Sequence, residues 1–287
     1  MIRSNSLFQQ MRWHCQNFRV RDWRAYFGIG LLGFIIGLEE PTQFDYRVFL
    51  LFVITSSLYL AFSFSINNCF DIKNDIIKEH KMNKNPVASG LIGFKESVFV
   101  SVLTASIGTL IACLCLNFLS LCIYAVLLLL SLSYSTPPLR LKSVPVADLV
   151  SHGLFFGSLL FLYGASVAGN LNQYVAALAF SLFIHSVALN LRNHLDDFNE
   201  DMLSKTKTTA CWLGRHNSVK ILNKLLVIHW AVLSIITLCV NPLFGILVNS
   251  VAPLIFFGLK KYTSLVRATD VCVSLVYTST IGYLVVL

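Results

Sequence analysis

The chain has 287 residues, a net charge of +8 and a mean hydropathy of +0.70, and only 13% of its residues are charged. Soluble domains carry about 25% charged residues, so this composition excludes a soluble globular protein. No nucleic-acid-binding motif accompanies the positive charge, and no nucleic-acid partner is expected. Apolar runs follow one another along the chain without a soluble linker, which predicts one polytopic bundle of membrane-spanning helices.

Residues 1–24 form a basic segment before the first apolar run. Its apolar side chains recur on one helical face, which predicts a helix lying in the membrane interface; they are Leu7, Phe8, Met11, Cys15 and Phe18. Residues 25–287 are expected to form a single transmembrane domain. Nine spans are predicted in it, at residues 25–38, 48–66, 97–116, 119–135, 146–168, 172–191, 221–240, 242–259 and 268–287.

The basic residues divide unevenly between the two sides of this topology. Of the 22 Lys and Arg residues, 21 fall on one side, and only Arg47 falls on the other. Loops rich in Lys and Arg remain cytoplasmic. The N-terminus and the polar loops on its side are therefore predicted to be cytoplasmic. Because the number of spans is odd, Leu287 is placed on the opposite side.

A polar motif follows the second span directly. Asn67, Asp71 and Asp75 are spaced four residues apart, and on a helix such residues share one face. Carboxylate and amide oxygens are the ligands that hard divalent cations take. The spacing therefore predicts a metal-binding face at the cytoplasmic end of this span, within a loop of about 25 residues that is long for a bundle.

The sixth predicted span ends in a second motif of the same kind. Asn193, Asp197 and Asp201 repeat the spacing, at an offset of 126 residues. Four acidic residues lie within positions 196–201, and they repel one another unless cations neutralise them. Bound metal can do this, or pairing with Lys205 and Lys207. Two such faces brought together are expected to hold Mg²⁺ ions with a diphosphate between them.

A third motif closes the fourth span with two prolines, which stop the helix. Arg140 and Lys142 follow the prolines and are expected at the cytoplasmic surface. Asp148 then stands at the head of the fifth span. Two interpretations of this carboxylate are open: a charge favoured by the helix dipole, or a side chain that orients Arg140.

These residues resemble the UbiA superfamily of intramembrane prenyltransferases over about residues 19 to 287. The resemblance rests on Asn67-x-x-x-Asp71-x-x-x-Asp75 closed by Pro86-Val87-Ala88-Ser89-Gly90, on Tyr134-Ser135-x-Pro137-Pro138-x-Arg140-x-Lys142, and on Asp197-Phe198-Asn199-Glu200-Asp201 with Lys207-Thr208 and Leu213-Gly214. One such motif alone is weak evidence. All three in this order, at span ends on one membrane side, are specific.

The resemblance implies a nine-helix bundle around a central cavity, capped by the two Asp-bearing loops. It implies Mg²⁺-dependent transfer of a prenyl chain from a prenyl diphosphate to a hydrophobic or aromatic acceptor in the membrane. Asn67, Asp71 and Asp75 would hold one metal ion, and Asp197 and Asp201 the other. Arg140 and Lys142 would contact the diphosphate, with Lys205 and Lys207 as further candidates, and Tyr134 would line the cavity near the reacting carbon.

The chain departs from the family pattern at several positions. Asn68 stands where the family often has Asp, and Asn85 where it often has Arg; Lys84 is a candidate to replace that lost charge. The third motif also lacks a usual Gly near Lys205.

The competing hypotheses are a secondary transporter or other cation-binding membrane protein, and an inactive relative of the same fold. Charges concentrated at span ends, with apolar span centres, favour the transferase over a transporter.

Overall fold

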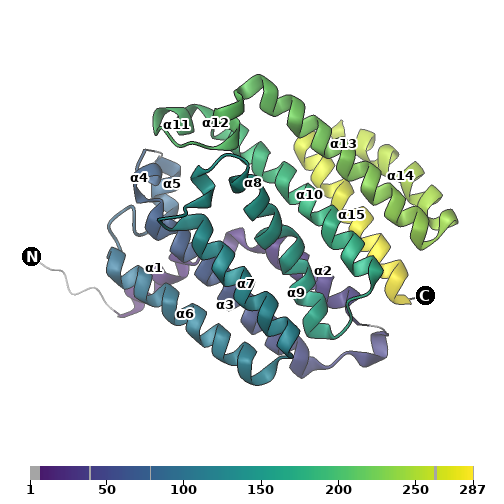
Figure 1. Cartoon of the computed structure of the whole chain (residues 1–287), viewed down its shortest axis with the longest axis horizontal. Coiled ribbons are helices and arrows are strands. Elements are labelled where there is room, and N and C mark those ends of the chain that lie inside the picture. The colour runs from purple at the N-terminus through teal and green to yellow at the C-terminus, as the bar shows by residue number, and fades with distance from the viewer. Residues whose placement is uncertain (1–6, 39, 78, 262–263, 287) are drawn as a thin grey trace, which may run out of the picture.

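The computed structural model describes residues 7–38, 40–77, 79–261 and 264–286. Within these ranges the chain forms helices joined by short connections and contains no strand, which confirms the predicted all-α class (Figure 1). Leu287, predicted to lie on the side opposite the polar loops, falls outside the described residues, as does the start of the N-terminal segment, residues 1–6.

Eight stretches among the described residues are long and apolar enough to cross a membrane, and each coincides with a predicted span. They are α3 (Tyr46–Phe70), α6 (Phe94–Cys115), α7 (Phe118–Ser135), the continuous run of α8 (Ala147–His152), η4 (Gly153–Ser158) and α9 (Leu159–Ala168), α10 (Gln173–Asp196), α13 (Arg215–Val240), α14 (Pro242–Lys260) and α15 (Leu265–Val286). The first predicted span forms α2 (Arg24–Ile36), which has 13 residues. At about 1.5 Å per residue it is shorter than a hydrocarbon core of about 30 Å.

Four helices begin with a side-chain cap at the end of the bundle that carries few charges. Asp45 accepts from the backbone N–H of Arg47 at 2.7 Å, and Asn117 accepts from that of Ser120 at 2.8 Å. Asn172 and Asn241 cap α10 and α14 in the same way. Such caps satisfy N–H groups that the first helical turn leaves without partners, so α7 and α14 can follow their preceding helices almost without a loop.

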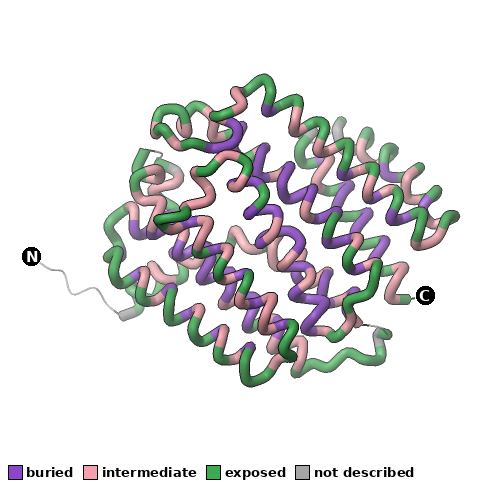
Figure 2. The backbone as a smooth tube through the Cα atoms, viewed as in Figure 1, coloured by how far each residue is buried: buried purple, intermediate pink, exposed green. Residues whose placement is uncertain are grey.

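Burial separates the inner helices from the outer ones (Figure 2). In the most apolar 18-residue window of the span from α8 to α9, 78% of the residues are buried, compared with 6% in that of α14. The outer helices expose large apolar side chains, such as Leu114 at 73% and Leu243 at 80%. Apolar surface of this extent is rare on soluble monomers, so the outer faces fit contact with lipid.

The charged segments gather at one end of the bundle (Figure 1). This polar end contains α1 (Leu7–Asn17), α4 (Ile72–Asp75), α5 (Glu79–Lys84), α11 (Phe198–Leu203) and α12 (Thr209–Leu213). The predicted N-terminal helix is present as α1, and its Phe8 and Met11 are exposed. Asn17 fixes it to the bundle: its amide donates to Ser97 Oγ at 2.8 Å, and its own carbonyl accepts from Asn68 at 3.0 Å. The buried Asn68 therefore holds the N-terminal helix in place.

Candidate active site

Both Asp motifs lie where a long helix ends and a short one begins. Asp71 separates α3 from α4 with φ −100° and ψ 2°, and Asp197 separates α10 from α11 with φ −92° and ψ 5°. This region of the backbone is sparsely populated and recurs at active sites. Each motif is therefore interrupted at its middle carboxylate, although the N–H groups of Asp75 and Asp201 still donate to the carbonyls of Asp71 and Asp197 at 2.9 Å. The side-chain oxygens of Asp and Asn compete with helical backbone bonds and favour such breaks.

The third motif contacts the first. Lys142 Nζ donates to Asn67 Oδ1 at 3.0 Å and also to Asp71 Oδ1. Arg140 Nη2 lies 3.7 Å from the same Asp71 oxygen. The Asn67 oxygen also accepts from Ser135 Oγ at 3.2 Å. Burial lowers the pKa of Lys142 below its ordinary value, although the Asp71 carboxylate acts in the opposite direction.

Asn85, which stands where the family often has Arg, contacts the first motif directly. Its Nδ2 donates to Asp75 Oδ2 at 2.8 Å, and its Oδ1 accepts from the backbone N–H groups of Val87 and Ala88. Burial, reinforced by the neighbouring Asp71 carboxylate, raises the pKa of Asp75 above its ordinary value. Asn85 therefore links the turn at Pro86 to a carboxylate whose charge is costly to maintain.

The two motif loops meet through α5 and the segment after α11. Lys81 Nζ on α5 pairs with Asp197 Oδ2 at 2.7 Å. Asn74 Nδ2 lies 3.4 Å from Thr206 Oγ1, across the same gap. The 126-residue repeat thus brings two carboxylate-bearing breaks to face each other, and each is paired with a lysine.

A cavity of about 190 Å³ lies between the loops, and we call it the mouth. Seven of the predicted residues line it: Asp71, Asp75, Tyr134, Lys142, Asn193, Asp197 and Asp201. Asn67 and Arg140 stand just behind, in contact with Lys142 and Asp71 respectively.

Three predicted lysines lie elsewhere. Lys84 lines a different hollow, where its Nζ is 4.0 Å from Asp22 Oδ1. Lys205 and Lys207 are exposed and are not among the side chains that line the mouth. Their predicted contact with a diphosphate remains an expectation that this arrangement does not support directly.

Aromatic rings lie below the mouth, inside the bundle. Tyr134 packs edge-on against Phe155 of η4, with centroids 5.1 Å apart. Tyr26 stacks on Phe156 at 4.0 Å and lies 5.8 Å from Phe64. Through Tyr134, the polar mouth therefore borders an apolar, ring-lined interior.

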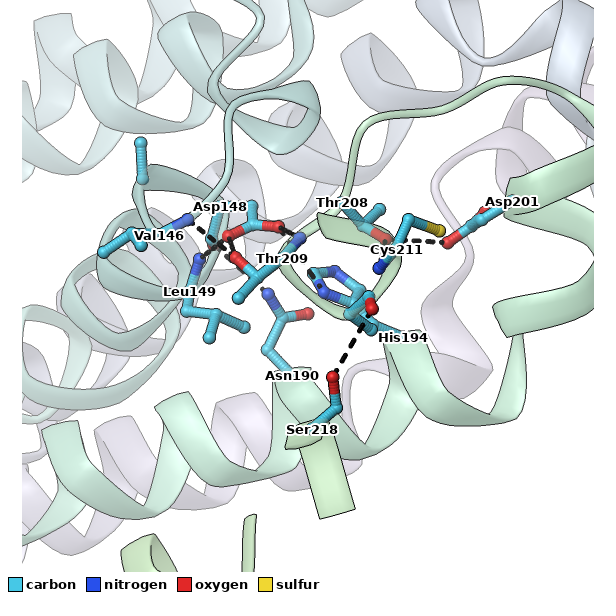
Figure 3. Close-up of polar contacts among 12 residues, drawn as sticks. Val146, Asp148, Leu149, Asn190, His194, Asp201, Thr208, Thr209, Cys211 and Ser218 are labelled. Carbon is cyan, nitrogen blue, oxygen red and sulfur yellow. Dashed lines mark hydrogen bonds and ion pairs between the residues drawn. The ribbon is translucent and has the colours of Figure 1, made fainter. Parts of the chain in front are cut away.

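Asp148 anchors the second motif loop and does not orient Arg140 in any contact of the described residues (Figure 3). Its buried carboxylate accepts from the backbone N–H of Thr209 at 2.6 Å and from the Thr209 hydroxyl. It also accepts from the N–H of Leu149 at 2.7 Å, which fits the helix N-terminal interpretation. His194 Nδ1 lies 3.5 Å from the same carboxylate.

The donor set fits Mg²⁺, although its side chains are not gathered around a single point. Among the described residues, no group of three or more His, Cys, Asp and Glu side chains has metal-binding spacing. The mouth nevertheless offers carboxylate and amide oxygens from both motifs, which are the donors that hard cations prefer. The ammonium groups of Lys142 and Lys81 lie against Asp71 and Asp197. Both carboxylates therefore point toward positions where a positive charge is favourable.

The sequence matches the model of the UbiA prenyltransferase family over residues 27–271. The chain belongs to the UbiA prenyltransferase family. It is 27% identical to a lycopene elongase/hydratase of Haloarcula japonica over 70% of this chain and 66% of that one. It is 31% identical to a digeranylgeranylglyceryl phosphate synthase of Methanosarcina mazei over 52% of this chain and 50% of that one. The matches thus span about two thirds and one half of these relatives.

Solved structures of UbiA homologues share the fold. One from Archaeoglobus fulgidus, bound to GPP and Mg²⁺, superposes with a TM-score of 0.74 at 19% identity, covering 95% of this chain and 98% of that one. A digeranylgeranylglyceryl phosphate synthase superposes with a TM-score of 0.71 at 18% identity, covering 96% and 98%. The predicted membrane bundle of the UbiA type is confirmed.

Sequence reasoning missed several residues of the mouth. In the sequence, Lys81 contributes only to the excess of basic residues on one side of the membrane. No feature of the sequence separates it from the other lysines of its loop. Asn85 is not part of the mouth lining, and the sequence marks it only as a departure from the family pattern, although Asn before Pro also favours a turn. Asn74, Thr206 and Thr208 also line the mouth, but isolated polar residues in polar loops carry no pattern that marks them.

Proposed function

We propose that this protein transfers a prenyl chain from a prenyl diphosphate to an aromatic or lipid-like acceptor within the membrane, and releases diphosphate with the help of Mg²⁺. The single observation that carries the proposal is the mouth: two carboxylate-bearing helix ends, each paired with a lysine, above an aromatic interior. Membership in the family supports it, as does the UbiA homologue of the same fold that binds GPP and Mg²⁺. The contacts described above for the mouth do not point to the transporter alternative.

Each group in the mouth has a task in this reaction. Asn67, Asp71 and Asp75 would hold one Mg²⁺, and Asn193, Asp197 and Asp201 another. Bound Mg²⁺ would stabilise the negative charge that develops on the departing diphosphate. Lys142 and Arg140, at the first motif, and Lys81, at the second, are placed to donate hydrogen bonds to diphosphate oxygens.

The interior would receive the prenyl chain and protect the allylic cation. Loss of diphosphate leaves a cation that water would quench, so the reacting carbon requires a dry pocket. Tyr134 lines the mouth and packs on Phe155, so it stands between the polar and the apolar zone. Aromatic faces also attract cations. Attack by the acceptor would then form the new bond.

The two named relatives differ in their products, a carotenoid and a phosphate-bearing lipid, so they leave the acceptor open between these chemistries. We further propose that the polar end and the N-terminus are cytoplasmic, because 21 of 22 basic residues fall on that side of the predicted topology.

The test is diphosphate release by the purified protein. The protein is given Mg²⁺, geranylgeranyl diphosphate and a panel of acceptors, with EDTA and Asp71→Ala as comparisons. We expect metal-dependent release that EDTA abolishes and that Asp71→Ala lowers at least 100-fold. A folded protein that binds Mg²⁺ yet releases no diphosphate with any donor length or acceptor would contradict the proposal.

A further inference from the structure

A second hollow, of about 720 Å³, lies at the polar end outside the mouth. It is bounded by α1, by η1 (Val20–Asp22) and by the end of α5, and we call it the basic groove. Its lining contains four basic side chains and one acidic one: Arg12, Arg19, Arg21, Lys84 and Asp22. The mouth is rich in carboxylates, so the linings of the two hollows differ in the sign of their charge.

Asp22 organises two of these cations. Arg19 Nη2 and Nε lie 2.8 Å and 2.9 Å from Asp22 Oδ2, and Lys84 Nζ lies 4.0 Å from Asp22 Oδ1. Arg19 adopts φ 53° and ψ 39° in the left-handed region, which is unfavourable for a residue with a Cβ. Its guanidinium also lies 5.4 Å from the centroid of the Phe64 ring. Arg19 is thus held in place, and a single carboxylate is shared between two cations.

The basic groove lies beside the interior of the bundle. It shares Asp22 with a cavity of about 640 Å³ between α2, α10 and α15, and this cavity is lined by Tyr26 and Phe156 of the ring-lined interior. On the other flank of the groove, α1 exposes Phe8 and Met11, as a helix in the membrane interface does. The groove therefore lies beside a helix suited to the membrane interface, where lipid headgroups are within reach.

We propose that the basic groove binds the phosphate headgroup of an anionic lipid. Guanidinium groups bind phosphate through paired, charge-assisted hydrogen bonds, and three arginines line this groove. Two sources share this chemistry: a phospholipid of the bilayer, and an acceptor that carries a phosphate. Headgroup binding does not require transferase activity, so it can be tested independently of the proposed reaction.

The first test measures binding of short-chain lipids to the purified protein by native mass spectrometry. Dioctanoyl phosphatidylglycerol is expected to bind more tightly than dioctanoyl phosphatidylcholine. The variant Arg12→Gln/Arg21→Gln is expected to weaken phosphatidylglycerol binding about tenfold or more. The matched control, Lys220→Gln/Lys224→Gln, removes the same charge from exposed positions of α13 and should leave binding unchanged. Equal loss in both variants, or no loss in the first, overturns the proposal.

The second test separates the two sources. The groove variant is assayed with a prenylglyceryl phosphate acceptor and with the corresponding unphosphorylated prenylglycerol. A rise of about tenfold in KM for the phosphorylated acceptor alone, with the donor KM unchanged, assigns the groove to the acceptor. Unchanged KM values, together with lost phosphatidylglycerol binding, assign it to bilayer lipid. If no transfer occurs with either acceptor, the binding measurement still decides the proposal.

Discussion

Lys81 and Lys84 lie three residues apart on α5, yet they face different hollows. Lys81 pairs with Asp197 in the mouth, while Lys84 lies beside Asp22 in the basic groove. A sequence comparison with the family points to Lys84, because it neighbours the position where Arg is common. The contacts point to Lys81 as the cation on the second motif.

We therefore predict that Lys81→Met lowers kcat/KM for the prenyl diphosphate more than Lys84→Met does. Loss of a hydrogen bond to a charged group costs about 1.5–3 kcal/mol, which corresponds to roughly a 10- to 100-fold decrease. Steady-state kinetics with varied donor would measure this, and Lys95→Met, at an exposed position of α6, is the charge-matched control. A larger effect of Lys84→Met would reverse the assignment.

The acidic residues themselves could be predicted from sequence, because their identity and spacing carry the chemistry. Asp71 and Asp197 stand where the spacing placed them, at the ends of two spans. Their cationic partners could not all be found. Lys142 belongs to a motif, but Lys81 reaches Asp197 only because α5 folds back toward a segment 116 residues away.

At the scale of elements, α2 and α9 pack with their backbones nearly in contact. A Cβ added to Gly33 would lie 1.9 Å from the Phe161 carbonyl oxygen, and one added to Gly164 would lie 2.0 Å from that of Gly30. Gly37, on the same helix, comes similarly close to the backbone of Ala165. A Cβ added to Gly28, by contrast, would have no neighbouring atom within 4 Å.

We predict that Gly33→Ala strongly destabilises the protein and that Gly28→Ala does not. The first change forces a methyl group into a backbone carbonyl, and rigid helices can relieve this only by separating. The second replaces Gly by a residue with a helix propensity better by about 1 kcal/mol. Thermal unfolding in detergent, followed by aggregation or by a thiol-reactive dye, would compare the two. Equal melting temperatures would contradict the close approach.

A second connection between elements runs from α8 to α12. Asp148 accepts two hydrogen bonds from Thr209, and the Thr209 hydroxyl accepts in turn from the N–H of Val146 at 2.6 Å. The adjacent Thr208 Oγ1 lies 3.4 Å from Asp201 Oδ2. The fifth span thus sets the position of the loop that bears the second motif.

We predict that Thr209→Val loosens this loop. Valine keeps the side-chain volume but removes one of the donors to the buried Asp148 Oδ1 and the acceptor of the Val146 N–H. Such losses cost about 1–3 kcal/mol. Faster hydrogen exchange at residues 205–213 and a lower melting temperature are expected, together with a weaker response to Mg²⁺. Thr209→Ser restores the hydroxyl and should recover most of each property; a serine variant as impaired as valine would show that packing alone matters.

For the molecule as a whole, hydropathy was sufficient to predict the bundle, because long apolar runs have few alternatives in a membrane. The order in which helices pack was not predictable, since it depends on side-chain fit between segments far apart in sequence. That order decides which loops meet. The mouth depends on the position of α4 and α5 near α11, and the basic groove depends on the position of α5 near α1 (Figure 1). Neither arrangement can be deduced from hydropathy.

The number of membrane crossings depends on α2. Eight described helices are long enough to cross, and α2 is a further, shorter one. If α2 also crosses, the total is odd and the two termini lie on opposite sides; if it does not, they lie on the same side. Its close packing against α9 along several turns favours a true crossing, because α9 is part of a span that reaches the end of the bundle opposite the mouth.

We predict that the N-terminus is cytoplasmic and the C-terminus is not. A green fluorescent protein fused to the N-terminus should fluoresce in bacterial cells, whereas the same fusion at the C-terminus should remain dark. Alkaline phosphatase fused to the C-terminus should be active, because it requires the oxidising side of the membrane. A fluorescent C-terminal fusion would place both termini in the cytoplasm. The number of crossings would then be even, and the assignment of the thirteen-residue α2 as a crossing would be wrong.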